Sequence, residues 1–204
     1  MRRFNRCLAP AGLLLLFFST VLQAGTITLD FERFPDSTIL TNQYPGVMFT
    51  DAIILTAGIS LNEFEFPPHS GVNVASDNTG PITLTFASTI TSFSGYFTYA
   101  EPLTVDAFGP TNNLVASATS AFSNNEALSG DTGSSPNEFL QVSFAGGINS
   151  VTITGDPAGA SFTLDDATYT KGGSSVPEPS TNVLVILGGL LAFLLYCNAN
   201  NRTN

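Results

Sequence analysis

Apolar and polar residues alternate along much of the chain. The first alternating run follows Gly25, where Ile27, Leu29 and Phe31 share one side and polar residues share the other. A period of two is typical of a half-buried antiparallel strand. Comparable runs follow at 82–86, 93–99, 103–105, 140–144 and 151–153.

Turn-forming residues separate these runs, at 77–81, 145–147 and 155–157. Short strands at such spacing, without a helical period or an internal repeat, are typical of an all-β domain. We therefore predict one antiparallel β-sandwich, jelly-roll-like, over residues 25–170. Its expected core contains Phe31, Phe86, Phe97, Phe144 and Phe162.

The last run of the domain is irregular. Its apolar residues change parity between Leu164 and Ala167, and the change falls at Asp165 and Asp166. A β-bulge supplies one extra residue in a strand and re-aims the side chains next to it. We therefore predict a bulge that turns both carboxylates toward the same side.

The amino-terminal end has the pattern of a secretory signal. The first 24 residues combine three arginines, an apolar run at 13–18, and Ala24 before Gly25. The alternative is an uncleaved anchor helix, but the apolar run is short for a hydrocarbon layer of about 30 Å. We predict that residues 1–24 are a signal peptide, cleaved between Ala24 and Gly25.

The carboxyl-terminal end follows a different plan. A predicted linker at 171–175 precedes six residues: Val176, Pro177, Glu178, Pro179, Ser180 and Thr181. An uncharged apolar run at 183–197 comes next. As a helix rising about 1.5 Å per residue it is a marginal membrane span. No amphipathic helix elsewhere in the sequence would cover it in a core, so we predict a transmembrane helix at 183–197.

Residues 176–204 resemble the PEP-CTERM sorting signal, on the motif at 176–181, the apolar run and the short polar tail. The resemblance implies processing by an exosortase, a membrane-embedded cysteine transpeptidase-like enzyme, while the chain is held in the inner membrane. It also implies delivery to the cell surface or an exopolysaccharide biofilm matrix. The family's tail usually ends in clustered Arg or Lys, whereas this one has only Arg202, a weak positive-inside signal. A GPI signal is the competing interpretation, although such signals normally end in their apolar run.

Cysteine and charge limit the chemistry of the region between the ends. Cys7 and Cys197 lie in the terminal segments, so we expect no disulfide and no thiolate chemistry in residues 25–175. The same region holds 15 acidic residues against Arg33 and Lys171, a formal balance of −13. Such a surface repels nucleic acid and anionic lipid. It attracts cations, or keeps an exported protein soluble.

Four carboxylates form a candidate cation site. Asp30 and Glu32 end the first strand, and Asp165 and Asp166 lie at the irregularity in the last one. These segments resemble the terminal strands of carbohydrate-binding-module-like jelly rolls. The resemblance implies a structural calcium ion, which hard carboxylate oxygens suit. The alternative is that the four residues are solvated strand-edge charges that discourage aggregation.

The sequence indicates no catalytic machinery, and we expect no enzymatic activity. A Ser-His-Asp site would need His69, the one histidine, whose Pro-Pro-His-Ser-Gly context favours an ordinary loop residue. A glycoside hydrolase would need two carboxylates at a set distance in space, and their spacing in the sequence does not identify such a pair.

Two other functions fit the sequence. A structural or interaction component of the cell surface or matrix needs a stable domain and an anchor, with the polar segment 123–137 as a contact loop or a mobile connector. The alternative is a module that binds an extracellular glycan on flat aromatic side chains. The chain has no Trp, so the candidates are Tyr44, Tyr96, Tyr99 and exposed Phe residues. Tyr96 is favoured because it lies opposite the core-facing side of its strand.

Overall fold

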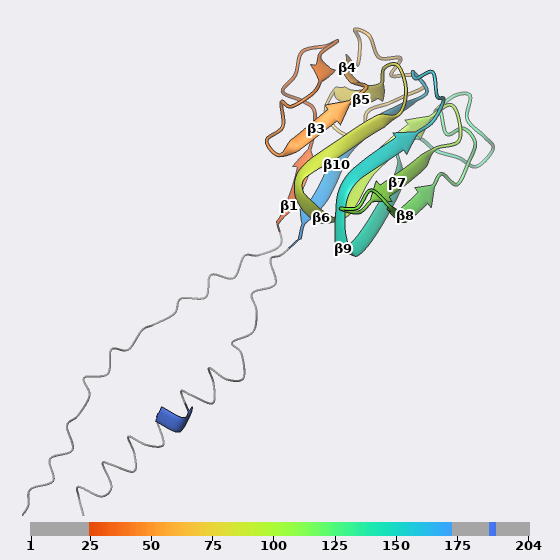
Figure 1. The fold of residues 1–204 in the computed structure, drawn as a ribbon. Coiled ribbons are helices and arrows are strands. Elements are labelled where there is room, and N and C mark those ends of the chain that lie inside the picture. Colours follow the sequence, from red (N-terminus) through yellow and green to blue (C-terminus); the bar gives the residue numbers. More distant parts are fainter. Residues whose placement is uncertain (1–24, 173–187, 191–204) are drawn as a thin grey trace, which may run out of the picture. The chain divides into compact units, whose positions relative to one another are not determined.

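The computed structural model describes residues 25–172 and 188–190. Ten strands occupy the first range (Figure 1): β1 (Thr26–Leu29), β2 (Ile39–Leu40), β3 (Val47–Thr50), β4 (Ala52–Thr56), β5 (Asn73–Asp77), β6 (Ile82–Tyr99), β7 (Thr104–Phe108), β8 (Leu114–Thr119), β9 (Glu138–Thr154) and β10 (Phe162–Lys171). Residues 188–190 are helical, and the described part of the chain has no helix that is long and apolar enough to span a membrane. The predicted signal peptide, the motif at 176–181 and most of the predicted helix at 183–197 lie outside the described residues.

The strands form one hydrogen-bonded sheet. Its order is β2-β4-β5-β10-β6-β9-β7-β8, with β1 added to β10 and β3 added to β6. Each of these pairings is antiparallel. The predicted all-β, antiparallel fold is therefore confirmed.

The long strands β6 and β9 join two halves of this sheet. The first part of β6 pairs with β3 and with the last part of β9, whereas its second part pairs with β10 and with the first part of β9. Both strands curve between these parts (Figure 1). Side chains from both halves, such as Leu84 and Phe97, belong to one core cluster. The two halves therefore pack face to face, which is consistent with a β-sandwich.

Two sequence-based expectations about β6 and β9 are wrong. The runs at 82–86 and 93–99 belong to one strand, as do those at 140–144 and 151–153. The segment 145–147 is also not a turn between strands. It lies within β9, between Ser143 and Ile148, which pair with Ser92 and Ile90 of β6. Four residues of β9 therefore stand opposite one residue of β6, which is a bulge-like irregularity.

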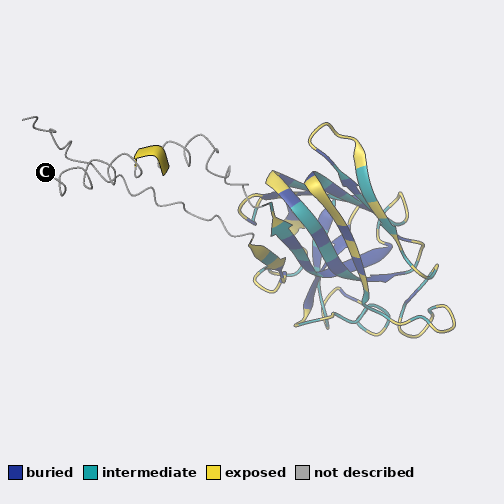
Figure 2. Ribbon diagram, turned by 90° about the horizontal axis from the view of Figure 1, so that it is seen from below, coloured by how far each residue is buried: buried dark blue, intermediate teal, exposed yellow. Residues whose placement is uncertain are grey.

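The same irregularity overturns the predicted burial of Phe144. Leu140 and Val142 point into the core, as the alternation predicts. Phe144 lies in the segment of β9 that is not paired in register with β6, and it is 39% exposed. Its ring lies against Gly146, where an added Cβ would come within 2.5 Å of it. The other four predicted core phenylalanines are at most 3% exposed and are confirmed: Phe31, Phe86, Phe97 and Phe162. Figure 2 shows the alternating buried and exposed bands along the strands.

Candidate functional site

The irregularity in β10 is a β-bulge, as the change of parity predicts. The register with β6 holds up to Asp165, shifts, and resumes at Thr168. Asp166 has a φ of 46°, in the left-handed region that Asp and Asn adopt more readily than other non-glycine residues. The bulge lets both carboxylates reach one loop, at His69 and Ser70.

The two carboxylates anchor this loop. The backbone N–H of Ser70 donates to Asp165 Oδ2 at 2.8 Å, and Ser70 Oγ donates to Asp166 Oδ1 at 3.0 Å. His69 Nδ1 lies 2.8 Å from Asp166 Oδ2, the single close contact between a basic and an acidic side chain within the described residues. Asp165 is 1% exposed, and its removal from water raises its pKa to about 6.

Three aromatic side chains lie beside this anchor on the outer face of the sheet. Asp165, Tyr96 and Phe139 are register partners across β10, β6 and β9. The His69 ring stacks on the Tyr96 ring, with centroids 3.4 Å apart and planes inclined by 8°. The Phe139 ring lies 5.4 Å from Tyr96 and the residue is 51% exposed. We call His69, Tyr96 and Phe139 the aromatic platform.

Polar side chains continue the same outer face away from the platform. The next row across β1, β10, β6 and β9 is Thr28, Thr168, Ser94 and Gln141, and the row after it is Thr26, Thr170, Ser92 and Ser143. The hydroxyls of Thr28 and Thr168 are 2.9 Å apart. Each residue in the two rows is exposed or half-buried. We call these two rows the hydroxyl ladder.

A third carboxylate holds the anchored loop from the side of β1. Glu32 Oε1 accepts the backbone N–H groups of Val72 at 3.1 Å and Asn73 at 2.9 Å. Three of the four predicted calcium ligands therefore contact the same short loop. They are Glu32, Asp165 and Asp166. All three already accept hydrogen bonds from that loop.

Asp30, the fourth predicted ligand, does not share these contacts. It is exposed and lines a pocket along β1, which Glu32 also lines. Over residues 25–172 and 188–190, no three His, Cys, Asp or Glu side chains are grouped closely enough to hold a metal ion. A structural calcium ion between the first and last strands stays a prediction.

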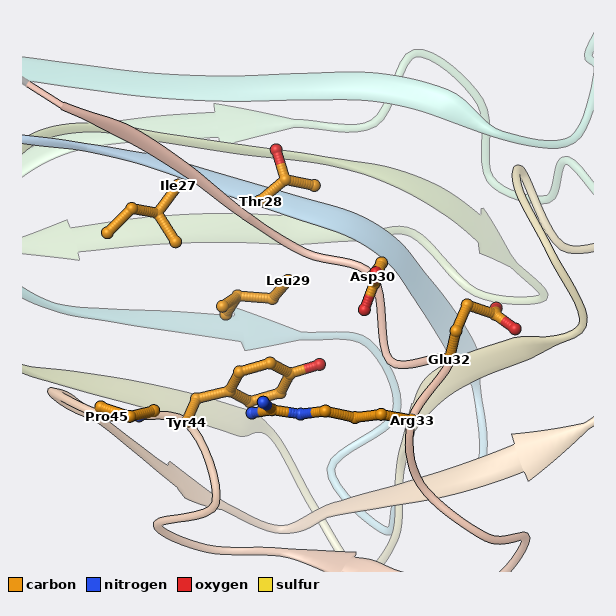
Figure 3. Close-up of a pocket in the computed structure, with 8 residues that line it drawn as sticks. All are labelled: Ile27, Thr28, Leu29, Asp30, Glu32, Arg33, Tyr44 and Pro45. Atoms are coloured by element: carbon orange, nitrogen blue, oxygen red, sulfur yellow. The ribbon is translucent and has the colours of Figure 1, made fainter.

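The pocket along β1 has a volume of about 570 Å³ (Figure 3). Its lining consists of Ile27, Thr28, Leu29, Asp30, Glu32, Arg33, Tyr44 and Pro45. The Arg33 guanidinium lies 4.3 Å from the Tyr44 ring centroid, and its Nη2 donates to the carbonyl of Gln43 at 3.0 Å. Because Tyr44 is 8% exposed and covered by Arg33, it has no free ring face for a sugar.

Tyr99 is also unavailable to a ligand. It is fully buried, its hydroxyl donates to Glu138, and burial raises its pKa to about 12. Of the three predicted tyrosines, Tyr96 is the one on an outer face, where the alternation places it. The stacking of His69 over one side of its ring has no signal in the sequence.

His69, Ser70 and Asp166 do not have the geometry of a nucleophilic relay. In a relay the histidine lies between the serine and the carboxylate. Here both His69 and Ser70 bond to Asp166, and no hydrogen bond joins the Ser70 hydroxyl to His69 in the described range. The arrangement fits the anchoring of a loop.

The polar segment 123–137 is anchored by residues that the sequence alone does not single out. Asn125 is fully buried, donates to the carbonyl of Phe97 at 3.0 Å and accepts the N–H of Tyr99 at 2.7 Å. Asp131 accepts the N–H of Ser123 at 2.9 Å. The high Asn, Asp and Ser content indicates local hydrogen bonding but does not identify partners on β6.

Comparisons with known proteins give likenesses of fold only. No protein-family model matches the chain, and no curated protein matches it. The K2 cleaved adhesin domain of Lys-gingipain is similar with 15% identity and a TM-score of 0.46, covering 72% of this chain and 98% of that one. A DUF4465 family protein from Bacteroides caccae has 10% identity and a TM-score of 0.44, covering 72% and 99%. The family 11 carbohydrate-binding module from Clostridium thermocellum has 10% identity and a TM-score of 0.33, covering 72% and 96%. At these values the likenesses carry no argument about the function of this chain.

Proposed function

We propose that the domain binds an extracellular glycan on the aromatic platform and the adjoining hydroxyl ladder. The observation that carries this proposal is the row of Asp165, Tyr96 and Phe139 across three strands, with His69 stacked on Tyr96. Isolated exposed apolar residues are common on protein surfaces. A stacked ring pair beside a half-exposed phenylalanine, held on strands and by a carboxylate, is a more specific arrangement.

The platform has the chemistry that a sugar ring requires. A pyranose ring has faces of C–H groups and a rim of hydroxyls. Phe139 and the outward face of His69 suit the C–H face, while Ser94 and Gln141 in the next row supply groups that both donate and accept hydrogen bonds. Because Asp166 fixes His69 before any ligand arrives, binding costs little side-chain entropy at that position.

Calorimetric titration of the purified full chain with neutral, amino-sugar and uronate oligosaccharides tests this function. We expect at least one class to bind, and Phe139→Ala to weaken that binding by about tenfold or more, because aromatic anchors dominate such contacts. Phe144→Ala is the matched control, since Phe144 is a second exposed phenylalanine of β9 outside the platform. If no class binds, or if both variants bind like the unmodified chain, the proposal is wrong.

We also propose that the chain reaches its glycan by export and carboxyl-terminal sorting. The support is the motif at 176–181 followed by the apolar run at 183–197, with an exosortase as the processing partner in the inner membrane. The last strand ends at Lys171, so a cut near Glu178 leaves every strand of the domain on the exported side. The destination is the cell surface or the exopolysaccharide matrix.

Replacement of Pro177, Glu178 and Pro179 together by Ala tests the sorting step in the native host. We expect a longer, membrane-retained form, because the extended recognition segment is lost while the apolar run remains. Deletion of 183–197 should instead release unprocessed domain. The readout is the intact mass of the protein in each cell fraction. An unchanged mature mass and location for the triple variant would contradict processing at this motif.

A further inference from the structure

We infer that the glycan bound at the aromatic platform contains amino sugars with free, protonated amines. This inference rests on the proposed function, and it adds the chemical class of the ligand. It is based on two observations of charge: the net negative charge of the whole domain, and the Asp166 carboxylate beside the platform.

The negative charge of the domain is almost uncompensated. Its 15 acidic residues face only Arg33 and Lys171, and the structure records no contact of either cation with a carboxylate within the described residues. Arg33 lies instead over an aromatic ring in the pocket along β1. Backbone N–H groups hold many of the carboxylates in place without neutralising them. The resulting field favours the approach of a cationic polymer and disfavours a polyanion.

The platform itself carries one of these charges. The Asp166 carboxylate touches His69 and its side chain is 20% exposed beside the stacked rings. Glu138 precedes Phe139 in β9, but its side chain lies on the opposite face of the strand, where it accepts the hydroxyl of the buried Tyr99. No Lys or Arg occurs in the loop 67–71 or in β6 and β9. The formal negative charge beside the platform therefore comes from β10, where Asp166 touches His69, and the one cation of that strand, Lys171, lies at its far end.

This charge distinguishes three kinds of sugar substituent. An ammonium group on a sugar seated on the platform gains a charge-assisted hydrogen bond with Asp166. An acetamido group in the same place gains only a neutral hydrogen bond, and a uronate carboxylate is repelled. The field and the local contact therefore select the same ligand class.

Matched oligomers of β-1,4-linked glucosamine, fully deacetylated or fully N-acetylated, test the inference by titration of the full chain at near-neutral pH. We expect the deacetylated oligomer to bind about tenfold tighter, as one charge-assisted hydrogen bond allows. Added salt should reduce this preference, because it screens exposed charges. Equal affinity, or tighter binding of the acetylated or a uronate oligomer, overturns the inference and leaves the proposed function standing. If no oligosaccharide of any class binds, the proposed function itself fails.

Two charge-matched variants locate the effect. Asp166→Asn keeps the shape of the side chain and suits the positive φ at this position, so it should remove most of the preference. The acetylated oligomer should also bind more weakly, because His69 loses its carboxylate partner, but its loss should be smaller than that of the deacetylated oligomer. Asp106→Asn, on β7, changes the net charge equally and should preserve the preference. Ser70→Ala, which removes one hydrogen bond to Asp166 without changing charge, should also preserve it. An equal loss of preference in Asp106→Asn and Asp166→Asn would show that the amine is not recognised at the platform, which overturns the inference.

Discussion

The strands and the loops of this domain become ordered by different chemistry. In the strands, backbone groups pair with one another and alternate side chains enter a common core. In the loops, carboxylates accept the backbone N–H groups: Glu65 binds Leu128 and Ser129, Asp77 binds Ser161 and Phe162, and Asp131 binds Ser123 and Asn124. A domain with so few cations uses its acidic residues for this purpose rather than for salt bridges. Its acidity is therefore partly a structural device, in addition to any effect on solubility.

The largest effect should come from the strand core. Phe86→Ala should lower the free energy of unfolding by about 3–5 kcal/mol, because it removes a ring that is 3% exposed. Phe144→Ala should cost less than about 1 kcal/mol, since that ring is 39% exposed. Chemical denaturation of both variants measures the difference. Equal losses would mean that the irregularity in β9 does not expel Phe144 from the core.

The contrast between strand and loop also describes what the sequence could predict. Alternation predicts the strands and four of the five core phenylalanines because strand periodicity is a local property. It fails at Phe144, because the glycine-containing segment 145–147 marks a break in the pattern but does not show that the break is extra length within one strand. The bulge at Asp165 could be predicted because parity changes within one run.

The candidate site was only partly predictable, for the same physical reason. Tyr96 and the two aspartates each stand out in their own strands. His69 joins them from a loop that is 97 residues away along the chain from Asp166, and periodicity contains no information about such a contact. The buried Asn125 belongs to the same class of long-range, loop-to-strand contact.

The next largest effect should come from a carboxylate at the end of β5 that holds a neighbouring loop. Asp77 is 1% exposed and accepts the N–H groups of Ser161 at 2.9 Å and Phe162 at 3.0 Å. Asp77→Ala should cost about 2–4 kcal/mol of unfolding free energy, because these buried donors lose their acceptor. Asp106→Ala, on a half-exposed strand position, should cost about 0.5 kcal/mol or less. If the two variants are equally mild, carboxylates do not hold the loops.

Titration of Asp165 should have a smaller effect on stability than the loss of Asp77. Its effect on the free energy of unfolding depends on pH. Burial raises its pKa to about 6, above the ordinary value of 3.8, so the folded state binds this proton more tightly than the unfolded state. Its contribution to stability is therefore present at low pH and is lost as the pH rises through about 4 to 6. Denaturation at several pH values should show this loss in the unmodified chain but not in Asp165→Asn. A parallel pH dependence in the two proteins would contradict the assignment.

The smallest effect should come from the hydroxyl ladder. Thr28→Val removes an exposed hydroxyl that pairs with Thr168 at 2.9 Å. The free energy of unfolding should change by about 0.5 kcal/mol or less, because both groups are accessible to water and the strand pairing remains. A thermal or chemical melt measures this directly. A loss comparable to that of Asp77→Ala would mean that the outer face is a stabilising element rather than a surface free to bind.

Chemical-shift mapping of the full chain with a bound oligosaccharide tests the central claim most directly. The account predicts that the ring resonances of His69, Tyr96 and Phe139 shift together on addition of ligand, with smaller shifts along the hydroxyl ladder. The ring resonances of Phe144 and Tyr44 should stay in place, since one lies outside the platform and the other lies under Arg33. Shifts concentrated in the pocket along β1, with an unchanged platform, would contradict the account.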